Sequence, residues 1–342
     1  MLKEAIARLM KREDLSRQQM SAVFDEIFSG HATPAQIAGF LVALRMKGET
    51  AEEIAGGAEA MRKNVTKVRV PEGRVVLDTC GTGGDSSHSF NISTAAAFVA
   101  AAAGATVAKH GARAVSSSCG SADVLSAAGV NIHAPVEVIE RCLREIGIGF
   151  LFAPNLHEVM KHVIGPRREL GIRSVFNLMG PLANPAGATH QLLGVYDAQL
   201  VPVLGRTLLA LGTARALVVH GEGGLDEISP CGPTRAVWIE GSAMEEIEIH
   251  PTQLGLPVRR VEELRGGDPA QNAERLRALL NGAEGALRDA VILNAAGALW
   301  VSGAAPDLRE GARMAGEILD SGRALAKLRE LVALTSEQRE AR

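Results

Sequence analysis

The chain has 342 residues, which is enough for two domains at roughly 150 residues each. Apolar residues make up 46% of the sequence, so a sizeable core can form and a disordered chain is excluded. Lys and Arg number 36 against 39 Asp and Glu, the net charge is −3, and aromatic residues make up only 3%. This composition argues against a nucleic-acid-binding surface.

Three features indicate a cytoplasmic protein that does not enter a membrane. The longest uncharged, mostly apolar run, Ala95–Ala108, is shorter than the ~20 residues that a membrane helix needs. The chain opens on an amphipathic pattern instead of a signal-peptide layout. Its four cysteines include no Cys-x-x-Cys pair, which fits a reducing compartment and argues against a zinc site or a disulfide framework.

Residues 1–66 predict a small helical domain. Leu2–Met10 carries one apolar helical face, and start signals with Gln or Glu three residues on occur at Ser16, Thr33 and Thr50. Each start signal precedes its own apolar stripe. Residues 156–182 also look helical. We expect the segment from about residue 160 to residue 184 to join this domain.

Residues 70–342 predict a large α/β domain with a mostly parallel sheet covered by helices, because strands and helices alternate. The expected strands are Arg74–Leu77, Thr106–Ala108, a short one near Ile132, Ile148–Phe152, Leu192–Tyr196, Ala216–Val219 and Ala236–Ile239. The expected helices are one from Thr94, then Ala122–Ala128, Val136–Ile146, Leu200–Leu211, Ala273–Leu280 and Leu308–Leu331.

The first candidate site loop is Gly-rich and runs from Asp78 to Asp85, followed by a polar stretch up to Thr94 at a helix start. Glycines let backbone amides turn toward an anion, and a helix N-terminus adds free N–H groups. Ser86 replaces the third glycine of a dinucleotide fingerprint, and Asp85 stands where a P-loop has lysine. The alternative is a tight surface turn with a Ser/Thr helix cap.

The second loop comprises Lys109–Arg113 and then Ser116–Ser121, and it follows the next strand along the chain. Lys supplies a point charge and Arg a forked set of donors, and both suit phosphate oxygens. The alternative is a solvated loop in which Ser121 caps the next helix. We favour the phosphate interpretation because parallel strands bring the two loops to the same edge of the sheet.

The third loop, His220–Ile228, contains adjacent carboxylates at Asp226 and Glu227. Carboxylate oxygens suit Mg²⁺, which keeps several waters and bridges to phosphorylated ligands. The alternative is surface charge, which we consider the weaker reading at a Gly-rich strand exit.

Two other signals are discounted on spacing alone. His157 and His162 are one residue too far apart for the zinc-protease motif. Arg167 and Arg168, near Glu169 and Arg173, have the pattern of a solvated helix face. The residues therefore indicate a Mg²⁺-dependent enzyme that acts on a phosphorylated small molecule, without naming the substrate.

The combination of motifs resembles the anthranilate phosphoribosyltransferase family over essentially the whole chain. The matching stretches are Asp78–Asp85, Asn91–Thr94, Lys109–Gly111, Phe176–Leu182 and Gly224–Glu227. The resemblance implies a helical domain and an α/β domain, as in pyrimidine nucleoside phosphorylases, and a homodimer. It also implies transfer of the phosphoribosyl group of phosphoribosyl pyrophosphate to the amine of anthranilate, with Mg²⁺, in tryptophan biosynthesis.

The resemblance also implies site residues. Phosphoribosyl pyrophosphate would be held by Gly81, Gly84, Asp85, Ser89, Asn91, Ile92, Ser93, Thr94, Lys109, His110, Gly111, Arg113, Ser116, Ser117 and Ser121. Magnesium would be bound by Ser93, Asp226 and Glu227, and anthranilate by Arg167 and Gly81. Lys109 would act in catalysis, and His110 would act there only in positioning. For Arg167, this replaces the surface interpretation given by spacing.

One residue departs from the family pattern. The family usually reads Lys-His-Gly-Asn-Arg, and this chain has Ala112 at the position of the asparagine, which normally helps to place anthranilate. Two rival functions are a nucleoside phosphorylase of similar fold and a non-catalytic paralogue that binds nucleic acid. Nucleoside phosphorylases lack this Gly-rich loop, which argues against the first rival. A nucleic-acid-binding paralogue is expected to have a basic surface, and the net charge of −3 argues against the second.

Overall fold

The computed structural model describes residues 1–85, 87–114 and 118–337. Its central feature is a seven-stranded sheet with the strand order β3-β2-β1-β4-β5-β6-β7. Strands β1 to β5 pair in parallel, and β6 and β7 add two antiparallel strands at one edge. The strands are β1 (Val76–Gly81), β2 (Thr106–Gly111), β3 (Ile148–Phe152), β4 (His190–Gly194), β5 (Arg215–Gly221), β6 (Thr234–Glu240) and β7 (Ala243–Ile249). The prediction of a mostly parallel sheet is confirmed.

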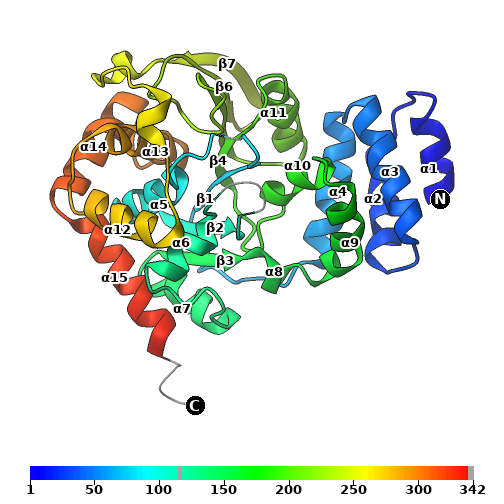
Figure 1. Ribbon diagram of the computed structural model, residues 1–342, viewed down its shortest axis with the longest axis horizontal. Coiled ribbons are helices and arrows are strands. Elements are labelled where there is room, and N and C mark those ends of the chain that lie inside the picture. The colour runs from blue at the N-terminus through cyan, green and yellow to red at the C-terminus, as the bar shows by residue number, and fades with distance from the viewer. Residues whose placement is uncertain (86, 115–117, 338–342) are drawn as a thin grey trace.

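Four N-terminal helices pack together beside the sheet (Figure 1). They are α1 (Leu2–Leu9), α2 (Arg17–Phe28), α3 (Pro34–Lys47) and α4 (Ala51–Asn64). Both halves of each predicted capping box form at Ser16, Thr33 and Thr50. The helical N-terminal unit is therefore confirmed, and local capping chemistry accounts for where its helices begin.

Two later helices, α9 (Lys161–Leu170) and α10 (Val175–Leu182), return to this helical unit. Helix α9 contacts α2 and α3, and α10 contacts α3 and α4. Aromatic packing supports the junction, since Phe176 of α10 meets Phe24 of α2 edge-on at 5.4 Å. Gly171, with φ of +62°, ends α9, so the region predicted to be helical is interrupted before α10. The domain boundaries themselves stay a prediction.

The remaining helices cover the sheet and the far end of the molecule. They are α5 (Ile92–Ala102), α6 (Ser121–Ala127), α7 (Val136–Glu145), α8 (Ala153–Leu156), α11 (Leu200–Ala210), α12 (Pro269–Leu280), α13 (Ala286–Ser302), α14 (Leu308–Asp320) and α15 (Arg323–Ser336), with short 3₁₀ turns at Glu158–Met160, Pro251–Leu254 and Val261–Leu264.

Alternating strand residues divide the core between the two faces of the sheet. Leu192 and Leu217 pack with α5 and α13 on one face. Leu193 and Val218 pack on the other face, in the same cluster as α11 and the N-terminal helices. Successive strand side chains point to opposite faces, so one sheet serves two cores and ties the helical unit to the α/β unit.

Several predicted element bounds were wrong. No strand forms at Ile132: the Asn131 side chain accepts a hydrogen bond from the His133 backbone at 3.1 Å, which makes a tight turn, while Ile132 is buried as an anchor. The predicted helix Leu308–Leu331 is two helices separated at Gly322, where φ is +69°. Strands β1 and β2 both extend beyond their predicted ends, to Gly81 and Gly111.

Candidate functional site

The three loops singled out from the sequence leave the carboxyl ends of parallel strands of the sheet. The first follows β1, the second follows β2 and the third follows β5, with β4 lying between β1 and β5. Ligands bind at this edge in open parallel sheets. The first and third loops meet there through hydrogen bonds between residues more than 100 positions apart.

The carboxylates of the third loop hold the backbone of the first. Asp226 accepts a hydrogen bond from the Gly83 amide at 3.0 Å, and Glu227 accepts one from the Ser93 amide at 3.0 Å. A Cβ atom on Gly81 would lie 2.4 Å from the Asp226 carboxylate, and one on Gly194 would lie 1.6 Å from the Asp226 carbonyl oxygen. Glycine at both strand ends is therefore what lets Asp226 enter the site.

The two carboxylates have strongly raised pKa values. Burial, and then the neighbouring Asp85, raises the pKa of Asp226 to about 7. Burial, and then Asp226, raises the pKa of Glu227 to about 8. Raised pKa values mean that the ionised forms of these two acids are unfavourable without a partner. Both side chains remain partly exposed, and a bound cation would stabilise their ionised forms.

The donor set fits Mg²⁺ better than a transition metal. Among the described residues, no three His, Cys, Asp or Glu side chains form a ready-made metal cage. Mg²⁺ needs only one or two carboxylates, since waters and substrate phosphates complete its octahedron. Asp226 and Glu227 supply those carboxylates, and the Ser93 hydroxyl lies at the same helix start.

Lys109 is buried beside these carboxylates. Its ammonium group donates to the Thr79 carbonyl at 2.5 Å and lies 3.5 Å from the Ser93 hydroxyl. Burial lowers the Lys109 pKa, and the charges of Asp78, Glu227 and Asp226 act to raise it. A cation is therefore held at the floor of the site, where it can face a bound anion.

Asp78 is an interior acid whose role the sequence did not indicate. It is fully buried in β1, and burial raises its pKa to about 6. The Asn184 side chain donates to it at 2.8 Å and the His110 backbone amide at 3.1 Å. These partners explain why β1 and β2 extend through polar residues, because the polar groups are satisfied across the sheet.

His110 and His157 form a buried pair. Their Nε2 atoms are 3.1 Å apart, and the His110 ring also makes a hydrogen bond to the Gly180 backbone. Burial lowers the pKa of His110 to about 3 and that of His157 to about 4, so both rings are neutral. His157 was discounted as part of a zinc motif, and only the folded chain shows that it contacts a residue of the second loop.

The neutral histidine pair predicts a loss of stability in acid. An unfolded histidine binds a proton below pH ~6.5, and the folded pair does not until about pH 4. We expect His157→Gln to remove roughly 2 kcal/mol of the difference in unfolding free energy between pH 7 and pH 5. Denaturant unfolding of both proteins at the two pH values measures this, and equal differences would contradict it. The unmodified protein and the variant must be compared, because Asp78, with its raised pKa, gives the unfolding free energy of both an opposite dependence on pH.

Arg167 of α9 and Arg173, which lies between α9 and α10, make different contacts. The Arg167 guanidinium lies 5.1 Å from the Phe176 ring centroid, and burial lowers its pKa. Arg173 stacks on Tyr196 at 4.3 Å and donates to the Gly84 carbonyl. Arg173, taken as a surface residue from its spacing, is therefore a direct contact of the Gly-rich loop.

The other predicted site residues are held by local contacts. The Ser87 hydroxyl donates to the Asp85 carboxylate, the Ser89 backbone amide donates to the Ser87 hydroxyl, and the Asn91 side chain donates to the Cys119 carbonyl. Ile92 and Thr94 are buried in the first turn of α5. Arg113 pairs with Asp123 at 2.8 Å, and Ser121 lies so close to Gly111 that a Cβ there would be 2.2 Å from its hydroxyl.

Two details of the second loop differ from expectation or lie beyond it. Gly120, not Ser121, is the N-cap of α6, and Asp123 accepts from the amides of Gly120 and Ala114 at 2.9 Å. Ser116 and Ser117 lie outside the described residues.

Among the described helices, none has the length and apolar character needed to cross a membrane.

Comparisons with known proteins cover almost the entire chain. A helical bundle domain of a glycosyl transferase family matches residues 3–65, and the a/b domain of a glycosyl transferase family matches residues 73–325. The anthranilate phosphoribosyltransferase of Anaeromyxobacter dehalogenans is 58% identical over 98% of this chain and 99% of its own length. That of Geobacter sulfurreducens is 52% identical over 98% of this chain and 100% of its own.

Solved structures agree with the sequence relatives. The Thermus thermophilus anthranilate phosphoribosyltransferase has a TM-score of 0.92 and 43% identity, covering 97% of this chain and 99% of that one. The Saccharomyces cerevisiae enzyme in complex with PRPP and Mg has a TM-score of 0.89 and 28% identity, covering 98% of each chain. Close sequence relatives, fold and loop geometry lead to one conclusion: the chain belongs to the anthranilate phosphoribosyltransferase family.

Proposed function

We propose that this protein transfers the phosphoribosyl group of phosphoribosyl pyrophosphate to the amine of anthranilate, in tryptophan biosynthesis. The observation that carries the proposal is the meeting of the Gly-rich loop, Lys109 and the Asp226–Glu227 pair at one edge of the sheet. The names of relatives at 50–58% identity support it. They support neither a nucleoside phosphorylase nor a nucleic-acid-binding paralogue.

Phosphoribosyl pyrophosphate, the donor substrate, is proposed to lie along the first two loops. Phosphate oxygens need N–H groups, and the backbone amides at the start of α5 supply them. The turn at Gly83 and Gly84, two residues with positive φ, supplies more. The predicted donor residues keep their assignments from Gly81 to Thr94 and from Lys109 to Ser121 as part of this proposal.

We propose Asp226, Glu227 and the Ser93 hydroxyl as the Mg²⁺ ligands. When bound, Mg²⁺ neutralises charge on the pyrophosphate leaving group. A yeast relative was solved in complex with PRPP and Mg, which supports a metal requirement here. The two raised carboxylate pKa values support it independently.

The reaction forms a bond from the anthranilate nitrogen to C1 of the ribose and breaks the bond from C1 to the pyrophosphate oxygen. The aromatic amine is neutral at pH 7 and has its own lone pair, so no strong general base is required, and the amine proton leaves to solvent. Lys109 offsets the negative charge that grows on pyrophosphate, as a fixed charge in a site sheltered from water. His110, held neutral by burial, is proposed only to position the second loop.

Anthranilate is proposed to bind with its carboxylate facing Arg167 and its ring near Gly81. Within the described residues no carboxylate pairs with Arg167, whose charge is left half-buried over Phe176. A relative was solved in complex with 4-fluoroanthranilate, which supports an acceptor pocket in this fold.

The assay mixes the protein with Mg²⁺, anthranilate and phosphoribosyl pyrophosphate and follows the loss of anthranilate fluorescence. Loss that requires all three additions would support the proposal. No loss, together with phosphate-dependent cleavage of a pyrimidine nucleoside, would favour the phosphorylase, and a shift of duplex DNA in a gel would favour the nucleic-acid-binding paralogue. We also propose a cytoplasmic homodimer joined through the helical units, which light scattering in solution tests.

Ala112 gives a prediction at the position where this chain departs from its family. Ala112 is exposed directly after β2, and its carbonyl accepts from the Ala122 amide at 3.2 Å. We expect Ala112→Asn to add a polar contact for the acceptor and lower the anthranilate KM about two- to twelvefold, since a neutral hydrogen bond contributes ~0.5–1.5 kcal/mol. The KM for phosphoribosyl pyrophosphate should stay unchanged.

The competing explanation is that Ala112 makes room for a bulkier acceptor. Asn would then crowd the pocket, and a ring-substituted anthranilate would be the better substrate of the unmodified protein. Steady-state kinetics with anthranilate and several substituted analogues separate the two, because a higher anthranilate KM in Ala112→Asn contradicts the added contact.

A further inference from the structure

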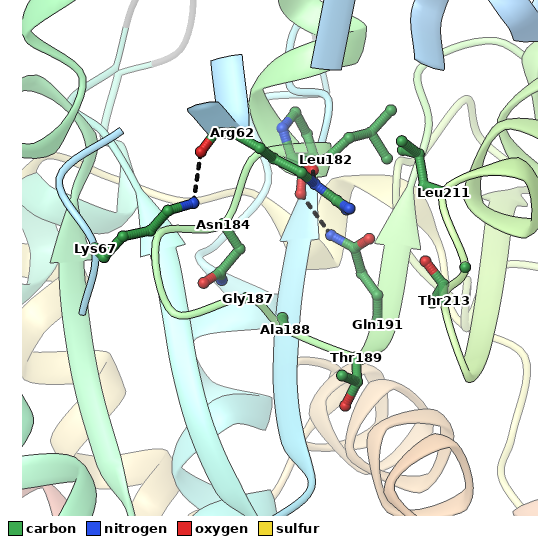
Figure 2. A pocket seen from close by; sticks show the side chains of 12 residues that line it. Arg62, Lys67, Leu182, Asn184, Gly187, Ala188, Thr189, Gln191, Leu211 and Thr213 are labelled. Atoms are coloured by element: carbon green, nitrogen blue, oxygen red, sulfur yellow. Dashed lines mark hydrogen bonds between the residues drawn. The ribbon is translucent and has the colours of Figure 1, made fainter. Parts of the chain in front are cut away.

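A cavity lies at the amino ends of the parallel strands, opposite the carboxyl ends that carry the candidate site. It is lined by residues that precede β4 and β5, and by the ends of α4 and α10 (Figure 2). Its volume is about 170 Å³. The strands run from this edge toward the loops that hold Asp226 and Glu227, so the cavity is separate from the proposed active site.

The charge of this cavity is entirely positive. Its lining contains Arg62 and Lys67 and no carboxylate. Both cations donate to backbone carbonyls instead of acids: Arg62 Nε to Leu182 at 2.7 Å, and Lys67 Nζ to Arg62 at 2.5 Å. Burial lowers the pKa of both side chains, and for Lys67 the charge of Arg62 adds to the effect.

Neutral polar groups surround the two cations. Figure 2 shows the Arg62 guanidinium extending over Gln191, with Thr213 on the facing loop. The Gln191 amide nitrogen is engaged with the Pro181 carbonyl at 2.7 Å. The ends of the guanidinium and the Thr213 hydroxyl are the donors on this side of the cavity.

We propose that this cavity binds a phosphate oxyanion, either free phosphate or the phosphate group of a small monoester. A half-buried guanidinium and an exposed ammonium group, with no acid in the lining, favour an anion between them, and a guanidinium matches phosphate geometry. The volume corresponds to about six water molecules at ~30 Å³ each, which suits one phosphate group.

The position of the cavity gives such an anion a structural consequence. Its lining comes from two of the places where the chain passes between the helical unit and the sheet, at 62–67 and 181–189. A bound anion would contact α4, the segment after α10 and the loop at Thr213 together. It therefore ties the helical unit to the amino edge of the sheet, and it should reduce opening of these segments.

Hydrogen exchange with mass spectrometry tests the proposal on the full-length protein, with inorganic phosphate against chloride at equal ionic strength. We expect phosphate to protect residues 62–68, 182–189 and 211–213. Arg62→Gln and Lys67→Gln should each raise the phosphate concentration for half-maximal protection at least about tenfold, the effect of losing one charge-assisted hydrogen bond. Arg62→Lys should keep part of the protection, and Lys63→Gln, an exposed neighbour outside the lining, should keep all of it.

The same experiment reports the active site separately, because phosphate bound there protects residues 81–94 in every one of these variants. Protection by ribose 5-phosphate at the cavity would extend the ligand to monoesters, and protection by inorganic phosphate alone would restrict it to free phosphate. No protection of the three cavity segments, or protection that persists in both Arg62→Gln and Lys67→Gln, would overturn the proposal.

Discussion

Replacing Asp226 with Asn and Glu227 with Gln together is expected to lower kcat by at least about a hundredfold while leaving the fold intact. The amide oxygens can still accept bonds from Gly83 and Ser93, so the change removes charge and little else. Loss of fixed electrostatic stabilisation at one group commonly has an effect of about 10²–10³ on rate. Steady-state assays at several Mg²⁺ concentrations measure it.

The same variant should be at least as stable as the unmodified protein without metal. The folded pKa values of about 7 and about 8 lie above the unfolded values near 4, so the folded state holds more protons between these limits. The unmodified protein therefore loses stability as the pH rises from about 4 to 8, and the variant does not. Its thermal midpoint should exceed that of the unmodified protein by more at pH 8.5 than at pH 5.5.

Glu222→Gln is the matched control, because Glu222 is an exposed acid of the same loop. It should change neither the rate nor the pH dependence of the melt. A midpoint lowered by tens of degrees in the double variant would mean that Asp226 and Glu227 hold the fold together instead of serving a metal.

Local signals in the sequence were sufficient for the helical unit. At Ser16, Thr33 and Thr50 the partner of each cap lies three residues away, so the interaction that begins the helix can be recognised without knowing the fold. The mostly parallel type of the sheet was also predictable, because the alternation of strands and helices can be recognised from the pattern of apolar residues along the sequence.

Polar residues inside buried strands were not predictable. Asp78 and Lys109 look like loop residues because an isolated charge is costly to bury. They fit inside strands because Asn184, which is 106 residues from Asp78, donates to Asp78, and the Thr79 carbonyl accepts from Lys109. Only the fold brings such a partner close, and the same applies to His157 beside His110 and to Arg173 beside Gly84.

For the site, motif spacing identified the loops, and the fold determined which side chains meet. The sequence placed Asp226, Glu227, Ser93 and Lys109 in three separate segments, and the described structure brings them together. Arg167 is different, since spacing alone described it as a surface charge and only the family resemblance assigned it to the acceptor. Its assignment is therefore the one that most needs a direct measurement.

Arg167→Ala is expected to raise the anthranilate KM roughly ten- to a hundredfold and to leave the KM for phosphoribosyl pyrophosphate within about twofold. A charge-assisted hydrogen bond to a carboxylate is worth ~1.5–3 kcal/mol, and this bond is proposed for the acceptor alone. The half-buried guanidinium makes no ion pair in the described chain, so its removal leaves no carboxylate without a partner. Initial rates with each substrate varied in turn provide the measurement.

Arg168→Ala provides the control, since Arg168 is exposed on the same turn of α9 and should change neither KM. Arg167→Lys tests the geometry, because a lysine keeps the charge and loses the forked donors, so an intermediate KM is expected. Removing Arg167 also removes its stacking on Phe176, which could shift α9 against α10. A shift of that kind would raise both KM values by similar factors, and in that case Arg167 would hold the helical unit in place and would not bind the acceptor.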